Sequence, residues 1–366
     1  MITTHHMGHF ETASLLAHAD RLKSGHVGTL GIFVAENHQD QLEEILIAAR
    51  ELPCPFFGGV VPGLIHDGAL ANGGILLAFF QGAADPCFIA DLQAPLTKPI
   101  TGTHPGVLVL VDGQASHITT FLDHLHRCSN PGVTYFGGGL GALAPPDHGL
   151  MFTREGISAN GAVLVPLPES PRLGIRHGWQ LLHSPLLASR TDDNVILELN
   201  WRPALEVYAE LVNPGLTTEN FFDQAKSHPL GMFREGGEPL VRDPVGVRED
   251  GGLICLAQVP ENASLAILQG SHSHLIGAAG EAADQALAPF QPLAPPGGLF
   301  LFDCVSRSLF LGPDFPQELD AVALQVLRRG FSCAVDGILT MGEIAAMDQG
   351  PLEFLNKTLV VCACHE

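Results

Sequence analysis

The sequence has few basic residues for its length. Its 366 residues include 18 lysines and arginines against 39 aspartates and glutamates, which gives a formal net charge of −21. An electrostatic field of this sign repels the phosphate backbone of nucleic acids and the headgroups of anionic membranes. We therefore expect neither a nucleic acid nor a membrane surface as a partner.

Long hydrophobic runs are also missing. No segment approaches the roughly 18 to 20 uninterrupted apolar residues that span a bilayer. The first residues, MITTHHMGHFETASLL, lack the basic flank and apolar stretch of a secretory signal. The eight cysteines are scattered, and several lie inside apolar runs such as GLICLAQV. These absences predict a cytoplasmic protein without membrane insertion, whose cysteines are mostly reduced thiols in the core.

Common catalytic motifs are absent. The patterns G-x-S-x-G, P-loop, H-E-x-x-H and EF-hand do not occur. The fragment GLGALA at 139–144 satisfies G-x-G-x-x-A, but Pro145 and Pro146 follow at once, so the helix that should hold a pyrophosphate cannot continue from it. Because no set of nucleophile, base and orienting residue emerges, the sequence predicts no enzyme and no catalytic residues.

An internal repeat is the first positive feature. Residues 30–80 and 106–168 each show the order strand, helix, strand, glycine-rich turn, strand, and they share PFFGG with TYFGG and ANGGILL with ANGAVLV. Both helices have one apolar face. These faces consist of Leu42, Ile45, Leu46 and Ala49 in the first copy and of Ile118, Phe121, Leu122 and Leu125 in the second. The repetition predicts a duplicated α/β unit.

The pattern changes after residue 179, where hairpins dominate. SRTDDNVILELN and VREDGGLICLAQV each place a turn before an alternating strand, while SHSHLIGAAGEAADQALA and PDFPQELDAVALQVLRRG are typical of helices. With 46% apolar residues, a chain of this length can fill two cores. We expect an α/β fold, α+β in the second half, in which the duplicated unit is followed by a mixed, hairpin-rich domain.

The segment PRLGIRHGW, residues 171–179, joins the two halves. Ligand pockets concentrate at such junctions, and Arg176, His177 and Trp179 supply a charge, an imidazole and a flat apolar wall. The structural alternative is that Trp179 anchors the core between the halves, Gly178 permits a tight bend, and Arg176 pairs with an acidic neighbour. Both interpretations fit the residues.

The chain contains 18 histidines, so only their arrangement is informative. His66 and His148 each lie beside an aspartate, shortly after the glycine-rich turn of their repeat. If the repeats pack with pseudo-twofold symmetry, both histidines could face one metal site, although both could also cap exposed turns. His117, His124 and Cys128 share a flank of the second predicted helix, as soft metal ligands or as a solvated edge.

Several longer segments occur in a specific order: TYFGGGLG, LGIRHGWQLLHSPLLASRTDDNVILELNWRPALEVY, RDPVGVREDGGLICLAQVPENASL, LFDCVSRSLFLG and LEFLNKTLVV. Together they resemble the FIST family, whose paired N-terminal and C-terminal domains are regarded as small-ligand sensory modules of bacterial signalling. The resemblance implies an N-terminal segment at 1–27, a FIST N-terminal domain at 28–201 with the internal repeat, and a FIST C-terminal domain at 202–366.

One branch of the family resembles nitric-oxide sensors that bind haem through a histidine and regulate partner histidine kinases. The resemblance therefore implies haem b, bound noncovalently with His177 as the favoured ligand, and signalling in trans to a histidine kinase or another protein. A second interpretation keeps the sensor but has no cofactor. In it, Arg176 binds the carboxylate of a metabolite such as an amino acid, Trp179 covers its apolar part, Glu343 binds an amino group and Arg307 adds a cation.

A third interpretation belongs to another functional class. A chain rich in histidine and containing cysteine can hold Zn²⁺ or copper ions. In this case the protein is a metal-binding protein or a metal-dependent enzyme. Its ligands would come from His66, His148, His117, His124 and Cys128.

Overall fold

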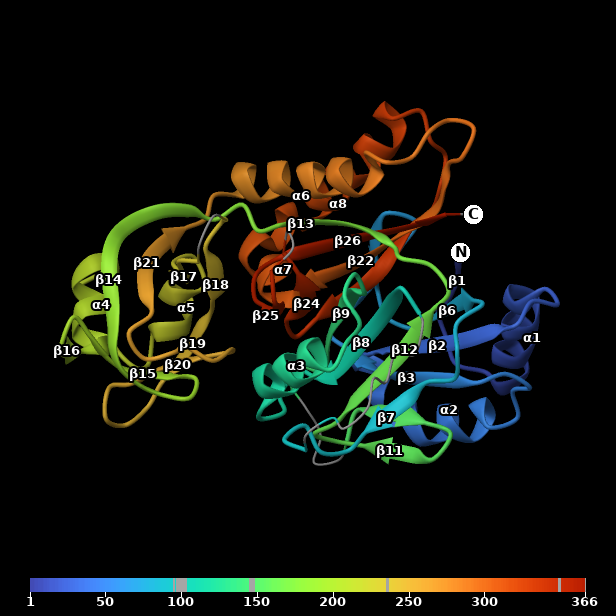
Figure 1. Cartoon of the computed structure of the whole chain (residues 1–366), viewed down its shortest axis with the longest axis horizontal. Helices are drawn as coiled ribbons and strands as arrows, with labels where there is room; N and C mark the ends of the chain where they lie inside the picture. Colours follow the sequence, from blue (N-terminus) through green and yellow to red (C-terminus); the bar gives the residue numbers. More distant parts are fainter. Residues whose placement is uncertain (95, 97–103, 145–148, 235–236, 348–349, 366) are drawn as a thin grey trace.

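The computed structural model describes residues 1–366 except for residues 95, 97–103, 145–148, 235–236, 348–349 and 366. In Figure 1 the chain forms a large body on the right and a smaller lobe on the left. Strands account for 40% of the chain and helices for 26%, which confirms the predicted α/β class. Among the described residues, no helix is both long and apolar enough to cross a membrane.

The first repeat builds one βαβ unit and a hairpin. Its elements are β2 (Gly28–Ala35), the short helix η1 (Glu36–Gln41), α2 (Leu42–Ala49), β3 (Phe56–Val61), the hairpin β4 (Leu64–His66) and β5 (Ala69–Ala71), and β6 (Ile75–Gln81). β3 runs parallel to β2, and β6 runs antiparallel to β2 on its other side. The apolar face predicted for α2 is buried.

The second repeat has the same order. Its elements are β8 (Gly106–Asp112), α3 (Ile118–Arg127), β9 (Thr134–Leu140), the hairpin β10 (Met151–Thr153) and β11 (Gly156–Ser158), and β12 (Ala162–Leu167). β9 is parallel and β12 antiparallel to β8. All four apolar residues predicted on α3 are buried. The predicted repetition is therefore confirmed.

A third repeat, which the sequence interpretation missed, lies at the end of the chain. Its elements are β22 (Pro296–Cys304), α7 (Val305–Leu311), η2 (Gly312–Asp314), α8 (Phe315–Arg328), β23 (Val335–Thr340), the hairpin β24 (Glu343–Ala346) and β25 (Leu352–Leu355), and β26 (Leu359–His365). Again the second strand is parallel and the last antiparallel to the first. The described residues thus contain three copies related in a cycle, so the pseudo-twofold packing under which His66 and His148 would face one site does not occur.

Each repeat contributes its hairpin to the sheet of another repeat. The hairpin β4–β5 pairs with β23, β10–β11 with β3, and β24–β25 with β9. An edge strand closes each sheet on the other side: β1 (Ile2–Met7) pairs with β6, β7 (Cys87–Ile89) with β12, and β13 (Arg172–Arg176) with β26. The result is three six-stranded sheets in the same order, each containing strands of two repeats.

The three sheets share one core. Alternate side chains on their inner faces meet there, including Phe33 of β2 and Phe300 of β22, whose ring centres are 5.9 Å apart, and the pair Phe136 and Phe302, at the same distance. The outer faces are covered by α1 (Thr12–Lys23) with α2, by α3, and by α6 (His272–Leu287) with α8. Segment 1–27 thus supplies both an edge strand, β1, and a covering helix, α1.

The lobe lies between β13 and α6 in the sequence. It contains β14 (Gln180–Asp192), β15 (Val195–Leu199), β16 (Arg202–Pro203), α4 (Ala204–Val212), α5 (Phe221–Ala225), β17 (Leu230–Met232), β18 (Leu240–Arg242), β19 (Pro244–Val247), β20 (Leu253–Cys255) and β21 (Ser264–Gln269). The predicted hairpin turns join β14 to β15 and β19 to β20. The expected boundary at 201/202 falls inside this lobe, since the chain returns to the body after β21 to complete the third repeat.

One glycine recurs at the same place in all three repeats. Gly58, Gly137 and Gly337 lie on β3, β9 and β23 opposite the preceding parallel strand. A β-carbon on Gly137 would lie 1.9 Å from the carbonyl oxygen of Val109, and the other two positions have 2.3 Å contacts of the same kind. Gly137 also has φ +147, which side chains disfavour.

Replacing Gly137 by alanine should therefore destabilise the body strongly. We expect a loss of about 3 kcal/mol or more in the free energy of unfolding, because backbone atoms cannot move aside as a flexible side chain can. Gly277→Ala is the control, since no atom lies within 4 Å of a β-carbon there, inside α6. It should gain up to about 1 kcal/mol from helix propensity. Urea unfolding followed by circular dichroism measures both, and equal effects would contradict the close-approach argument.

Candidate functional site at the joint between body and lobe

The chain passes from body to lobe through residues 177–179. Trp179 is only 4% exposed, its Nε1 donates to the carbonyl oxygen of Lys357 at 3.1 Å, and its ring centre lies 5.0 Å from that of Phe310. The chain returns to the body past Gly270, where a β-carbon would lie 2.2 Å from the indole ring. Trp179 therefore packs between the two crossings and anchors the joint.

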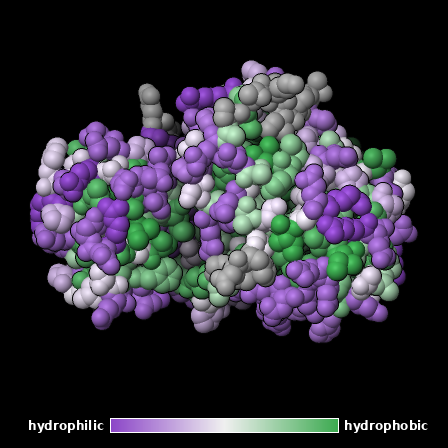
Figure 2. All heavy atoms as spheres, turned by 90° about the horizontal axis from the view of Figure 1, so that it is seen from below, coloured by the Kyte–Doolittle hydropathy of each residue, from purple (hydrophilic) through white to green (hydrophobic). Residues whose placement is uncertain are grey.

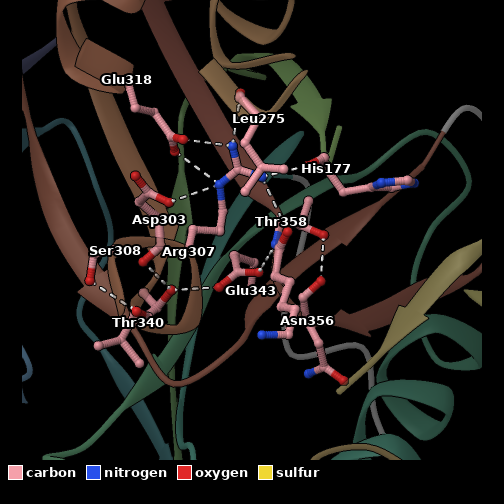
Figure 3. A network of polar contacts seen from close by, with 12 residues as sticks. His177, Leu275, Asp303, Arg307, Ser308, Glu318, Thr340, Glu343, Asn356 and Thr358 are labelled. Atoms are coloured by element: carbon pink, nitrogen blue, oxygen red, sulfur yellow. Dashed lines mark hydrogen bonds and ion pairs between the residues drawn. The ribbon is translucent and has the colours of Figure 1, made fainter. Parts of the chain in front are cut away.

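Arg307 of α7 organises the buried part of the joint (Figure 3). It is fully buried, and Nε and Nη2 donate to the two carboxylate oxygens of Glu318, both at 2.9 Å. Nη1 donates to the carbonyl oxygens of His177 and Lys357, and Nη2 also donates to that of Leu275. These contacts use all five N–H groups of a guanidinium. Arg307 therefore connects α6, α8 and the segment 177–179 by hydrogen bonds. It has no N–H group left to bind a ligand.

Two further carboxyl groups lie beside Arg307. Asp303, at the end of β22, is fully buried, and its Oδ1 lies 3.5 Å from Arg307 Nε. Burial raises the pKa of Asp303 well above its usual range, and the nearby carboxylate of Glu318 raises it further, while Arg307 opposes the shift. Since Arg307 already pairs with Glu318, it cannot fully compensate a second buried carboxylate, and the protonated form of Asp303 is favoured.

Glu343, the second of these carboxyl groups, lies next to Thr340 and Thr358. The hydroxyl of Thr340 lies 3.1 Å from the carbonyl oxygen of Asp303 and 2.8 Å from Glu343 Oε1. When Glu343 is protonated, its carboxyl group can donate to the Thr340 hydroxyl, whose single proton is then free for the carbonyl oxygen of Asp303. Glu343 Oε2 accepts from the backbone N–H of Thr358. Burial raises the pKa of Glu343 to about 8, which favours the protonated form at neutral pH.

A second polar cluster connects the lobe directly to the body. Asp243 of the lobe accepts hydrogen bonds from Ser306 at 2.9 Å and from Lys357 Nζ at 3.1 Å. Lys357 Nζ also donates to the carbonyl oxygen of Lys226 in the lobe. Burial raises the pKa of Asp243, while Lys357 and Ser306 lower it. This cluster was not predicted, although its residues lie in RDPVG, CVSRS and LNKT, where charged residues interrupt apolar sequence.

The ring of His177 points away from Arg307 (Figure 3). Its Nδ1 accepts the backbone N–H of Trp179 at 2.9 Å, so the proton of the neutral ring is on Nε2, which lies 3.5 Å from Glu238 Oε2. Burial, followed by the charge of Arg307, lowers the pKa of His177 to about 4. A haem iron needs a nitrogen lone pair, and here one nitrogen accepts a backbone hydrogen bond and the other is protonated. The arrangement does not fit axial ligation, and the haem assignment stays a prediction.

The other predicted ligand residues are not gathered in one pocket. Arg176 Nη1 donates to Gln285 at 3.0 Å on the outer side of α6, and its Nε lies 3.6 Å from Glu281. Trp179, Arg307 and Glu343 belong to the buried joint. The interpretation of Trp179 as an anchor and Arg176 as an ion-pair partner therefore describes their positions best.

A cavity of about 360 Å³ lies next to this joint, between body and lobe. The body contributes residues 113–120, which lead into α3, with Met341 and Phe354; the lobe contributes the β14–β15 turn, β20 and Gln258. The carbonyl oxygens of Gln258 and Phe354 also accept hydrogen bonds from the buried Arg242 of β18. Figure 2 shows body and lobe meeting along a seam, with apolar side chains on both sides. The cavity thus shares walls with the joint.

The predicted metal ligands lie in separate places. His117 lines the cavity, Cys128 donates its thiol proton to the carbonyl oxygen of Leu96, and His148 lies outside the described residues. His66 is in the β4–β5 hairpin, where its Nδ1 lies 2.8 Å from Asp336 Oδ1. Within the described part of the chain, His66, Asp67 and Asp336 form the group whose ligand atoms are close enough together for a metal ion.

The proton on Glu343 has a consequence for stability. A carboxyl group with a higher pKa in the folded than in the unfolded chain binds its proton more tightly when folded. Its contribution to stability is therefore present below the ordinary glutamate pKa of 4.5 and is lost as the pH rises to about 8. Glu343→Gln keeps a donor for Thr340 and an acceptor for Thr358, so it should remove this pH dependence.

We expect Glu343→Gln to match the wild type near pH 5 and to be more stable at pH 9, by an amount on the order of a few kcal/mol. Urea unfolding across this pH range measures the difference, which isolates Glu343 from the other buried carboxyl groups. If the free energies of unfolding of the two proteins changed with pH in the same way, Glu343 would be ionised in the folded chain.

Comparison with known proteins places the chain in a family. The model of the FIST N domain matches residues 29–202, and that of the FIST C domain matches residues 204–346. No curated protein matches the sequence. A solved structure of T. maritima PurL complexed with ADP aligns with 99% of this chain and 70% of its own, at 10% identity and a TM-score of 0.19, which is too low to support an inference. The two matches together cover most of the sequence, and the chain belongs to the FIST family, whose domains are generally sensory domains for small ligands.

Proposed function

We propose that the protein is a cytoplasmic sensor of a small metabolite and that the ligand, an amino acid, binds in the cavity between body and lobe. The cavity itself carries this proposal. Its volume of about 360 Å³ is that of a small-molecule site, and its position between two separately folded parts is where such sites concentrate. A ligand there would touch both parts at once.

The lining of the cavity complements a zwitterion. The first turn of α3 presents backbone N–H groups that have no partner inside the helix, and these favour a carboxylate. On the lobe side, the exposed Asp193 offers a carboxylate to an ammonium group. Met341, Phe354 and Ile254 supply apolar surface for a side chain. A neutral zwitterion also avoids the repulsion that a net charge of −21 exerts on anionic ligands.

Ligand binding would be transmitted as a change in the position of the lobe. A ligand that touches both parts favours the arrangement in which both contacts form, and it shifts the population accordingly. In our proposal a partner protein, such as a histidine kinase, detects this change. Noncovalent haem b with nitric oxide as the signal is the alternative from the sequence resemblance, and the contacts of His177 give it no support.

The proposal predicts which substitutions disturb binding. Ser116→Trp should fill the cavity and weaken amino-acid binding by about 10-fold or more, whereas Ser273→Trp, on the exposed first turn of α6, should leave it unchanged. Asp193 has φ +53, a conformation that asparagine also tolerates. Asp193→Asn should therefore weaken binding of an amino acid more than binding of the matching hydroxy acid.

A thermal-shift screen of amino acids identifies the ligand, and isothermal titration then measures these variants. A Ser116→Trp protein that binds the ligand as tightly as the wild type would place the site elsewhere.

A further inference from the structure

A histidine cluster on the far side of the body has no role in the proposed sensor. His66 and Asp67 lie at the β4–β5 hairpin, Asp336 lies on β23 of the third repeat, and Thr4 and His6 lie on the edge strand β1. The exchange of hairpins between repeats places His66 and Asp67 beside Asp336, although His66 and Asp336 are 270 positions apart in the sequence. The ligand atoms of His66, Asp67 and Asp336 lie within 4.8 Å of one another.

Asp336 fixes the tautomer of His66. Its Oδ1 accepts from His66 Nδ1 at 2.8 Å and from the backbone N–H of Asp67 at 3.0 Å, and its Oδ2 accepts from the hydroxyl of Thr4. With the side chain of Asp336 only 2% exposed, these three donors hold it in one orientation. The proton of His66 is therefore on Nδ1, which leaves a lone pair on Nε2. A carboxylate that orients a histidine in this way is the usual outer partner of a metal ligand.

The tautomer of His6 is fixed by a separate hydrogen bond, which leaves the lone pair of His6 on Nδ1. Its Nε2 lies 2.7 Å from the carbonyl oxygen of Gly73, which can only accept, so the proton is on Nε2 and Nδ1 is free to act as a ligand. The ring centres of His6 and His66 are 5.3 Å apart. Two imidazoles bound to one tetrahedral zinc ion at about 2.1 Å have ring centres roughly 5 Å apart. The ring spacing suits a shared ion. Because His6 lies outside the group whose ligand atoms are already within 4.8 Å of one another, binding must draw its Nδ1 toward His66.

We propose that His66 Nε2, His6 Nδ1 and the carboxylate of Asp67 bind one divalent transition-metal ion such as Zn²⁺, with Asp336 as a positioning residue. Asp67 Oδ2 lies 3.6 Å from His66 Nε2. Asp67 is 78% and His66 31% exposed, so an ion can enter from solvent. Three protein ligands of this kind leave a fourth position for water. The ion would join the N-terminal strand to strands of the first and third repeats.

The chain offers a matched control on the same strand. His5 is adjacent to His6 but points to the opposite face of β1, where its ring stacks on that of His18 with centres 3.7 Å apart. His5→Gln removes one histidine from the same segment without touching the proposed site. It separates a specific site from general affinity of a histidine-rich segment for metal ions.

The test uses the full chain without a histidine tag, stripped of metal by a chelator and titrated with Zn²⁺ against a chromophoric competitor. We expect one tight site per chain, weakened more than about 100-fold by His6→Gln and by His66→Gln and unchanged by His5→Gln. Asp336→Asn should weaken it about 10- to 100-fold. In the wild type, nitrogen NMR shifts should show His66 protonated on Nδ1. Zn²⁺ should also raise the unfolding temperature of the wild type and of His5→Gln.

Two results would overturn the proposal. One is a wild-type protein without a tight stoichiometric site. The other is equal weakening by His5→Gln and His6→Gln, which would mean that the histidines bind ions without a defined geometry. Unfolding of each variant without metal establishes that it is folded before its affinity is compared.

Discussion

The exchange of hairpins among three repeats is the constraint on which the rest of this structure depends. Each βαβ unit places its hairpin on the sheet of another unit, so the sheets share strands as well as the apolar core between them. The three close approaches of a glycine to a neighbouring carbonyl recur because each unit has the same parallel strand pair. The body is in this sense a single interlocked unit, although its sequence consists of repeated modules.

The same exchange positions both candidate sites. The β24–β25 hairpin brings Glu343 to the Arg307 network and Phe354 to the cavity beside the lobe. The β4–β5 hairpin brings His66 to Asp336 of another repeat. The lobe adds its own charges, Asp243 and Arg242, to the joint, where burial makes every unpaired charge costly. Most of these charges pair with one another, although both oxygens of Asp303, Asp243 Oδ1 and His177 Nε2 are buried without a hydrogen-bond partner. The ligand site lies beside the joint, between the walls of body and lobe.

The sequence predicted the features that depend on local pattern and missed those that depend on pairing between distant segments. Periodicity identified the buried faces of α2 and α3, because one face of each helix meets the core. The third repeat was missed because LNKT replaces ANGG before its last strand and because α7 precedes its long helix. Arg307 and Glu343 were singled out as ligand-binding residues, but only the fold shows that their hydrogen bonds are made to other parts of the buried joint. His66 was paired with His148 on the assumption of twofold symmetry, whereas the cyclic arrangement of three repeats places it beside Asp336 and His6.

Hydrogen exchange measured by mass spectrometry tests the interlocking of the three repeats most directly. Under native conditions with increasing urea, peptides covering β3, β9 and β23 should exchange with the same free energy of opening and the same urea dependence, because no repeat can leave without breaking a sheet of another. The lobe can open separately, since its sheet contains no strand of the body. If one repeat opened with a smaller free energy and a weaker urea dependence than the other two, the repeats would be independent modules and the interlocking of the body would be contradicted.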